Sequence, residues 1–175
     1  MSDKIYNVLF LCTGNSARSI LGEAVMNKLG AGRFKAWSAG SQPKGEVHPM
    51  ALSVLEGMGY DTTGMYSKSW SEFSKPGSPE FDFIFTVCDS AAGETCPVWI
   101  GHPMTAHWGI EDPAAVEGEG QRDAFLQALR YLTNRISLFL TLPHSSIDEM
   151  AMRQKLKDIG KAEGASSGAS AGENA

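Results

Sequence analysis

An apolar strand that runs into a glycine-containing loop and then a helix constrains this chain more than any other feature. The stretch at residues 8–19 reads VLFLCTGNSARS, and an amphipathic run follows at 21–29. Cys12 and Arg18 stand six positions apart, with Gly14 between them. In such a loop, backbone N–H groups and the N-terminus of the following helix converge on one point and favour an anion. The stretch therefore predicts a buried strand whose carboxyl end carries an oxyanion site.

Cys12 is the predicted nucleophile of this loop. The field that favours an anion also favours a thiolate, so we expect the pKa of Cys12 to lie well below the free value of about 8.5. Arg18 stays charged and offers planar, bidentate donors to a tetrahedral oxyanion. Ser19 could donate a hydrogen bond to the thiolate and Asn15 could hold the strained loop, or both could be plain helix caps. The alternative is a buried structural cysteine beside a surface arginine.

Composition limits the classes of function. The 175 residues, 42% of them hydrophobic, suit one domain with one core. A net charge of −5 without a cluster of Lys and Arg argues against a nucleic-acid partner. We expect no membrane partner and a cytoplasmic location, because neither a signal peptide nor an apolar run of about 18 residues is present. Three cysteines do not suit a secreted disulfide framework, which favours catalytic, redox or metal-binding roles.

Alternating strand and helix patterns predict a single three-layer α/β domain with a doubly wound parallel sheet. The expected strands are 5–11, 33–38, 81–87 and 104–108. The expected helices follow Arg18 and cover about 49–58, 70–73 and 119–140. We place the catalytic domain at residues 1–142. A helical extension, capped by Ser145 or Ser146, should occupy 143–160, and the low-complexity stretch 161–175 is expected to be a disordered tail.

Two further chemical residues follow predicted strands. Cys88 comes directly after strand 81–87, and Asp112 lies in the loop after strand 104–108. Ligands of open α/β sheets bind at the carboxyl ends of the strands, so both residues are expected on the same rim as Cys12. Pro113 biases Asp112 toward extended geometry, which would aim its carboxyl group at a leaving oxygen as a general acid. The alternative for this dipeptide is an ordinary turn.

Cys88 and Cys96 form a candidate redox pair. Eight residues of intact helix would hold their Cα atoms roughly 12 Å apart, whereas a disulfide needs about 4.4–6.8 Å. The intervening segment must therefore be a loop or must unfold. Two alternatives remain, namely buried structural cysteines and a zinc site completed by His102 and His107. No Cys-x2-Cys spacing supports the zinc site.

Together these motifs resemble the low-molecular-weight protein tyrosine phosphatase family, and within it the arsenate reductases that work with thioredoxin. The resemblance covers residues 5–142. It rests on CTGNSARS at 12–19, SAG at 38–40, TVCD at 86–89, CP at 96–97 and HWGIEDP at 107–113.

The resemblance implies a four-stranded parallel sheet and a set of roles for the residues above. Cys12 would be the nucleophile, Arg18 the oxyanion clamp and Asp112 the general acid. Cys88 and Cys96 would form a disulfide relay. The residues implied to bind the oxyanion are Thr13, Gly14, Asn15, Ser16, Ala17, Arg18 and Ser19.

A substrate and partners are also implied. Arsenate is the expected substrate, with phosphate as a competing anion. Thioredoxin is expected as reductant before glutaredoxin with glutathione, because a second in-chain thiol makes a small thiol unnecessary. No cofactor is required, although similar reductases hold a potassium ion beside the loop, which would place one at Asn15 and Glu23.

Two alternatives to a reductase remain open. A phosphatase would hydrolyse a Cys12-phosphate intermediate with water and would need neither Cys88 nor Cys96. However, Ala114 and Ala115 stand where phosphatases of this fold usually place tyrosines, which favours the reductase. A non-catalytic oxyanion-binding module could use the same loop. The region from residue 143 onward lies outside the resemblance.

Overall fold

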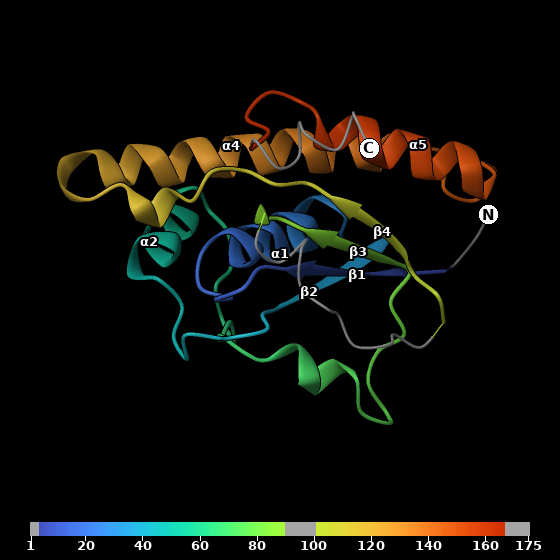
Figure 1. Ribbon diagram of the computed structural model, residues 1–175, viewed down its shortest axis with the longest axis horizontal. Coiled ribbons are helices and arrows are strands. Elements are labelled where there is room, and N and C mark those ends of the chain that lie inside the picture. The colour runs from blue at the N-terminus through green and yellow to red at the C-terminus, as the bar shows by residue number, and fades with distance from the viewer. Residues whose placement is uncertain (1–3, 90–100, 167–175) are drawn as a thin grey trace.

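Four parallel strands form the centre of the protein, as the sequence pattern predicts (Figure 1). The computed structural model describes residues 4–89 and 101–166. The strands are β1 (Tyr6–Leu11), β2 (Phe34–Ala39), β3 (Phe83–Thr86) and β4 (Met104–His107). Their order across the sheet is β2-β1-β3-β4, and every neighbouring pair is parallel. The carboxyl ends of all four strands therefore lie along one edge, where ligands of such sheets bind.

The central strand β1 contributes side chains to two separate cores, because successive residues of a strand point to opposite faces. Val8 and Phe10 pack into the larger core. Leu9 and Leu11 pack into a smaller core on the other face, together with Phe81. Burial on both faces explains why the sequence of this strand is continuously apolar.

Helices complete the layers on either side of the sheet (Figure 1). The larger core includes residues of α1 (Arg18–Leu29), α2 (Pro49–Gly57), α4 (Gln121–Leu140) and α5 (Glu149–Gly160). The described 3-10 helices are η1 (Trp70–Phe73), η2 (Pro113–Ala115) and η3 (Gly118–Gly120). Helix η1 packs against the smaller core, which confirms the three-layer arrangement. No described helix is both long and apolar enough to span a membrane.

The last helix begins later than the sequence analysis expects. Its N-cap is Asp148, whose carboxylate accepts a hydrogen bond from the N–H of Ala151 at 2.9 Å. The prediction that Ser145 or Ser146 caps this helix is therefore wrong. The chain is still in a turn there, because the N–H of Ser146 donates to the carbonyl of Pro143.

The low-complexity stretch 161–175 is predicted to be a disordered tail. This prediction is wrong for residues 161–166, which are packed and which we call the strap, while residues 167–175 lie outside the described residues. Ser166 is only 3% exposed, and the fully buried Arg135 of α4 donates to the carbonyl oxygens of Ala162 and Glu163, both at 3.1 Å. The strap also pairs with the chain after β4 through a bridge between Ala165 and Ile110. The segment is held by its backbone, so it needs no large apolar side chain.

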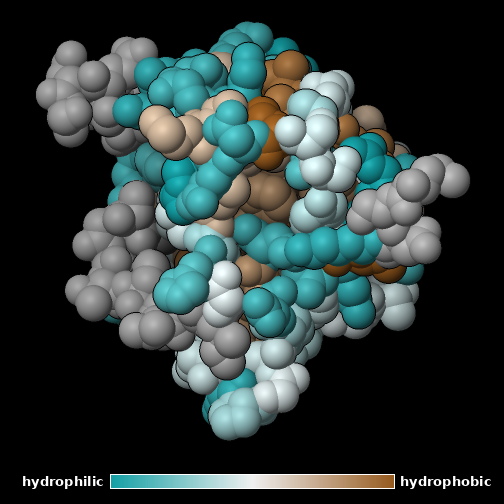
Figure 2. All heavy atoms as spheres, turned by 90° about the vertical axis from the view of Figure 1, so that its right-hand side faces the viewer, coloured by the Kyte–Doolittle hydropathy of each residue, from teal (hydrophilic) through white to brown (hydrophobic). Residues whose placement is uncertain are grey.

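Charged side chains close the opposite, amino end of the sheet. Lys4 pairs with Asp82 at 2.9 Å, and the other carboxylate oxygen of Asp82 accepts from the N–H of Asn7 at 2.8 Å. Figure 2 shows a predominantly hydrophilic face with small hydrophobic areas between polar side chains. Asp82 directly precedes β3, so its bond with Asn7 ties the start of β3 to the start of β1.

Gly22 of α1 lies directly against the ring of Phe10 in β1. A Cβ atom at position 22 would lie 2.8 Å from Phe10 Cδ1, closer than side chains pack. We therefore expect Gly22→Ala to lower the free energy of unfolding by about 1–3 kcal/mol, because overpacking a tight core forces strain. Urea denaturation followed by circular dichroism measures this change.

The matched control is Gly57→Ala at the end of α2, where the nearest atom to a new Cβ is the flexible tip of Arg122 at 3.4 Å. This variant should be neutral or stabilised by up to about 1 kcal/mol, because alanine favours a helix over glycine. Equal destabilisation of the two variants would contradict the close packing of α1 on β1.

Candidate active site

The loop between β1 and α1 has the strained backbone that an anion cradle requires. Asn15 adopts a left-handed conformation, with φ at 43°, and is completely buried. Its Oδ1 accepts a hydrogen bond from the N–H of Lys68 and its Nδ2 donates to Ser19 Oγ, both at 2.8 Å. Ser19 thus supports Asn15 and, in the described structure, not the sulfur of Cys12. The side chain of Asn15 holds the loop, as expected from the sequence.

Gly40 allows the end of β2 to pass close to this loop. A Cβ atom there would collide with the carbonyl oxygens of Cys12 and Thr13. The N–H of Gly40 donates to the carbonyl of Lys68, and the N–H of Trp70 donates back to Gly40. The SAG motif at 38–40 therefore has a steric role in shaping the site.

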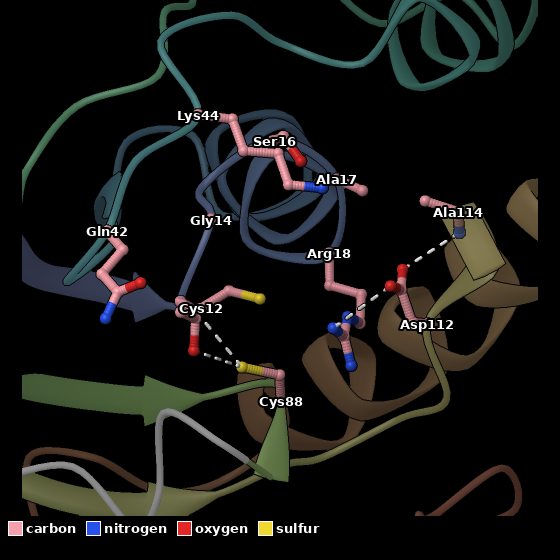
Figure 3. Close-up of a pocket in the computed structure, with 11 residues that line it drawn as sticks. Cys12, Gly14, Ser16, Ala17, Arg18, Gln42, Lys44, Cys88, Asp112 and Ala114 are labelled. Atoms are coloured by element: carbon pink, nitrogen blue, oxygen red, sulfur yellow. Dashed lines mark hydrogen bonds and ion pairs between the residues drawn. The ribbon is translucent and has the colours of Figure 1, made fainter.

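A cavity of about 400 Å³ opens at this edge of the sheet (Figure 3). It brings together the loop, the end of β3 and the chain before η2. Its lining residues are Cys12, Thr13, Gly14, Ser16, Ala17, Arg18, Gln42, Lys44, Cys88, Asp112 and Ala114. Asn15 and Ser19, which the resemblance implies as oxyanion-binding residues, are buried and do not line the cavity. Cys96, the third predicted redox residue, lies outside the described residues.

The two described cysteines are neighbours at the floor of the cavity. Both are buried thiols, with 6% of Cys12 and 3% of Cys88 exposed. The N–H of Thr13 donates to Cys88 Sγ at 3.3 Å, which ties Cys88 to the base of the loop. Cys88 lines the same cavity as Cys12 and lies close enough to affect the pKa of its thiol. A second thiol therefore lies within reach of the predicted nucleophile.

The pKa of Cys12 departs from the expectation. The neighbouring Cys88 thiol and burial raise the pKa of the Cys12 thiol well above its usual value. The positive charge of Arg18 and the N–H of Gly14 act in the opposite direction but are outweighed. The predicted depression of this pKa is thus wrong for the anion-free pocket, because the sequence argument counted the loop amides and the guanidinium but neither the second thiol nor burial.

Arg18 and Asp112 face each other across the mouth of the cavity (Figure 3). Arg18 Nη1 donates to the carbonyl of Ile110 at 2.9 Å, and Nη2 lies 3.9 Å from Asp112 Oδ2. Arg18 Nε is buried and has no hydrogen-bond partner among the described residues. The other oxygen of Asp112 accepts from the N–H of Ala114, so Asp112 caps η2 as an ordinary turn residue would. Its carboxyl group still lines the cavity.

Lys44 is a site residue that the sequence analysis missed. Its N–H donates to the carbonyl of Gly14 at 3.0 Å, and its side chain lies over the loop, with the amino group directed toward Ser16 and Ala17 (Figure 3). Lys44 adds a second cation beside Arg18. It lies in a connecting loop without periodicity, so no local sequence signal marks it.

The described residues do not fit a potassium ion at Asn15 and Glu23. The ammonium of Lys68, a residue 6% exposed, donates to the carbonyl oxygens of Ser38 and Tyr66 at 3.0 and 2.9 Å and lies 3.9 Å from Glu23 Oε1. Burial raises the pKa of Glu23 and lowers that of Lys68, and each charge partly offsets the effect on the other. A protein cation already occupies the position beside the loop.

His107, proposed in the zinc alternative, makes hydrogen bonds instead. Its Nε2 lies 2.8 Å from Asp89 Oδ1, and its Nδ1 lies 2.7 Å from Thr86 Oγ1. Over residues 4–89 and 101–166, no group of three or more His, Cys, Asp or Glu side chains could hold a metal ion. The described part of the chain therefore gives no support to a zinc site.

Comparisons with known proteins agree with this geometry. The family described as low molecular weight phosphotyrosine protein phosphatase matches residues 7–156. An arsenate reductase of Oceanobacillus iheyensis is 33% identical over 141 residues, which cover 79% of this chain and 96% of that protein.

Solved structures show the same fold. An arsenate reductase in the phosphate-binding state has a TM-score of 0.60 at 28% identity, over 76% of this chain and 98% of that one. A thioredoxin-dependent arsenate reductase of Corynebacterium glutamicum has a TM-score of 0.60 at 22% identity, over 83% of this chain and 66% of that one, and shows the fold alone. With its four-stranded parallel sheet and matching range of residues, the chain belongs to the low molecular weight phosphotyrosine protein phosphatase family.

Proposed function

We propose that this protein is an arsenate reductase in which Cys12 attacks arsenate and Cys88 releases arsenite. The observation that supports this most directly is the position of Cys88, which lines the cavity beside Cys12 and is tied to the N–H of Thr13. A phosphatase of this fold needs no second thiol there. The similar arsenate reductases support the same assignment.

Oxyanion binding follows from the charges around the cavity. The loop N–H groups and the N-terminus of α1 favour a dianion. Arg18 contributes its guanidinium, including the buried Nε that has no partner among the described residues, and Lys44 adds a charge from above. Phosphate has the same shape and charge as arsenate, so it should compete for the cavity.

The first chemical step forms a bond between the Cys12 sulfur and arsenic. The thiol of Cys12 can give its proton to the bound dianion, which overcomes the raised pKa of the resting state. The sulfur then attacks arsenic and one oxygen leaves as water, with its second proton supplied by Asp112 acting as general acid. Arsenic remains pentavalent in this adduct.

The second step transfers two electrons to arsenic. The thiolate of Cys88 attacks the Cys12 sulfur, the sulfur–arsenic bond breaks, and its electron pair stays on arsenic, which leaves as arsenite. A Cys12–Cys88 disulfide remains. Attack of Cys96 on Cys88 would then move the disulfide to 88–96 and free Cys12, and the dithiol of thioredoxin would reduce it.

Replacement of Cys88 with serine separates the reductase from a phosphatase. In an assay that couples NADPH oxidation to arsenate through thioredoxin and thioredoxin reductase, we expect the wild type to turn over. Cys88→Ser should lose multiple turnover entirely, because the sulfur–arsenic bond is no longer broken by a second thiol. Slow hydrolysis of an aryl phosphate should survive in Cys88→Ser, because that reaction needs only Cys12, Arg18 and Asp112.

Two controls accompany this assay. Cys12→Ser should lose both activities, whereas a binding module would show neither activity in the wild type. Glutaredoxin with glutathione, offered in place of thioredoxin, tests the choice of reductant. Unchanged thioredoxin-linked turnover in Cys88→Ser would refute the relay.

The contact between the two thiols also predicts the pH dependence of Cys12. Cys88→Ala removes the largest cause of the raised pKa, so the thiolate of Cys12 should form at lower pH than in the wild type. The measurement is the rate of Cys12 alkylation by iodoacetamide against pH, read by mass spectrometry. A midpoint that stays unchanged or moves upward would mean that Cys88 does not hold the Cys12 proton.

The ammonium of Lys68 predicts that potassium has no specific effect. Turnover and the unfolding midpoint of the wild type should be equal in KCl and NaCl at the same ionic strength. Lys68→Met should be destabilised by about 3 kcal/mol, because it leaves the buried Glu23 without its counter-charge. Lys35→Met, at an exposed position, is the control and should change stability by less than about 0.5 kcal/mol. Activation of the wild type by potassium but not sodium would overturn this assignment.

A further inference from the structure

A chain of hydrogen bonds links the strap to the residue that follows Cys88. Ser166 Oγ donates to Asp89 Oδ1 at 2.6 Å, and His107 Nε2 lies 2.8 Å from the same oxygen. Thr86 Oγ1 lies 2.7 Å from the other ring nitrogen of His107. One carboxylate oxygen thus joins the C-terminal segment to the ends of β3 and β4, next to Cys88.

Ser166, Asp89 and His107 form a hydrogen-bonded cluster, and the strap is anchored independently on both sides of it. On one side, Arg135 holds the carbonyl oxygens of Ala162 and Glu163. On the other side, the N–H of Ser166 donates to the carbonyl of Gly109 at 3.0 Å. Ser166 is therefore held by its backbone, and its hydroxyl is presented to Asp89.

The packing around the cluster leaves no room for an additional atom. A Cβ atom at Gly109 would collide with Ser166 Oγ and would lie 2.6 Å from His107 Nε2 and 2.8 Å from Asp89 Oδ1. Gly109 is therefore the residue that allows these three side chains to meet.

The strap also contacts the chain that leads to the acid side of the cavity. Ala165 bridges Ile110, and the carbonyl of Ile110 accepts the hydrogen bond from Arg18. Asp112 follows two residues later. The same short segment thus contacts the chain after Cys88 and the chain before Asp112.

We propose that the strap is a positioning element of the relay, in which Ser166, through Asp89, holds the backbone after Cys88 so that its sulfur stays against the loop. This inference rests on the proposed function for its kinetic part, and on the geometry alone for its effect on Cys88. Ser166 is a positioning residue, because it acts through Asp89 and does not touch the cavity lining.

Ser166→Ala in the full-length, reduced protein tests the proposal. It removes the hydroxyl but keeps the N–H that binds Gly109. We expect alkylation of Cys88 by iodoacetamide, read by peptide mass spectrometry, to become about fivefold faster, since one side-chain hydrogen bond is lost. Single-turnover arsenite release without thioredoxin should fall by about the same factor. The arsenate concentration for half-maximal rate should not change, because the anion cradle is untouched.

Gly109→Ala is the second variant and should act in the same direction, because its methyl group wedges the three side chains apart. Glu163→Gln is the matched control. It lies on the strap and loses only the exposed 3.5 Å contact of its carboxylate with Arg130, so both rates should equal those of the wild type.

The readouts separate this inference from the proposed function. Faster Cys88 alkylation in Ser166→Ala and Gly109→Ala supports the positioning role of the strap, even if neither the wild type nor any variant reduces arsenate. If arsenate is turned over but Cys88 alkylation is unchanged in both variants, the proposed function stands but the proposed role of the strap is wrong. A lowered unfolding midpoint with unchanged alkylation at 25 °C would show a structural role only and would likewise overturn it.

Discussion

Adjacency of β1 and β3 in the sheet determines the chemistry that this protein can perform. Leu11 pairs with Thr86, and the N–H of Val87 donates to the carbonyl of Leu11 at 2.9 Å. Because the strands are parallel, both chains leave the sheet at the same edge, one as Cys12 and the other as Cys88. Exchange of either strand with an outer neighbour would separate the two sulfurs. The loop after β1, Asp112 and the strap are arranged around this pair of thiols.

Residues that follow strands are the most predictable part of the site. The apolar runs that end at Leu11 and Val87 identify buried parallel strands, and elementary sheet geometry then places Cys12 and Cys88 on one rim, together with Asp112 in the loop after strand 104–108. Lys44 and Lys68 could not be found in this way. Both lie in irregular loops and are placed by segments distant in sequence. The backbone N–H of Lys44 donates to the carbonyl of Gly14, and the ammonium of Lys68 donates to the carbonyl of Ser38.

The C-terminal region shows a second limit of reasoning from composition. A segment of small and polar residues was expected to remain disordered because it has no apolar surface to bury. The buried guanidinium of Arg135 reverses that argument, because it needs carbonyl acceptors and the strap supplies two of them. Burial lowers the pKa of Arg135 from its ordinary value, which reflects the cost of enclosing this charge. These contacts between Arg135 and the strap join distant parts of the sequence, so they can be recognised only in the tertiary structure.

The raised pKa of Cys12 changes how the site is expected to work. A cradle that ionised its cysteine permanently would expose a reactive sulfur to any electrophile that entered the cavity. Here the neighbouring Cys88 thiol and burial favour the protonated thiol, against the pull of Arg18 and the N–H of Gly14. In the proposed mechanism, arsenate that enters the cavity would bring its own proton acceptor, so ionisation of Cys12 would be coupled to occupancy by the substrate. The neighbouring Cys88 that keeps Cys12 protonated would also be in place for the next step. Protection of the resting thiol and the speed of the proposed disulfide step would therefore depend on one interaction, and a substitution that weakens it should affect both.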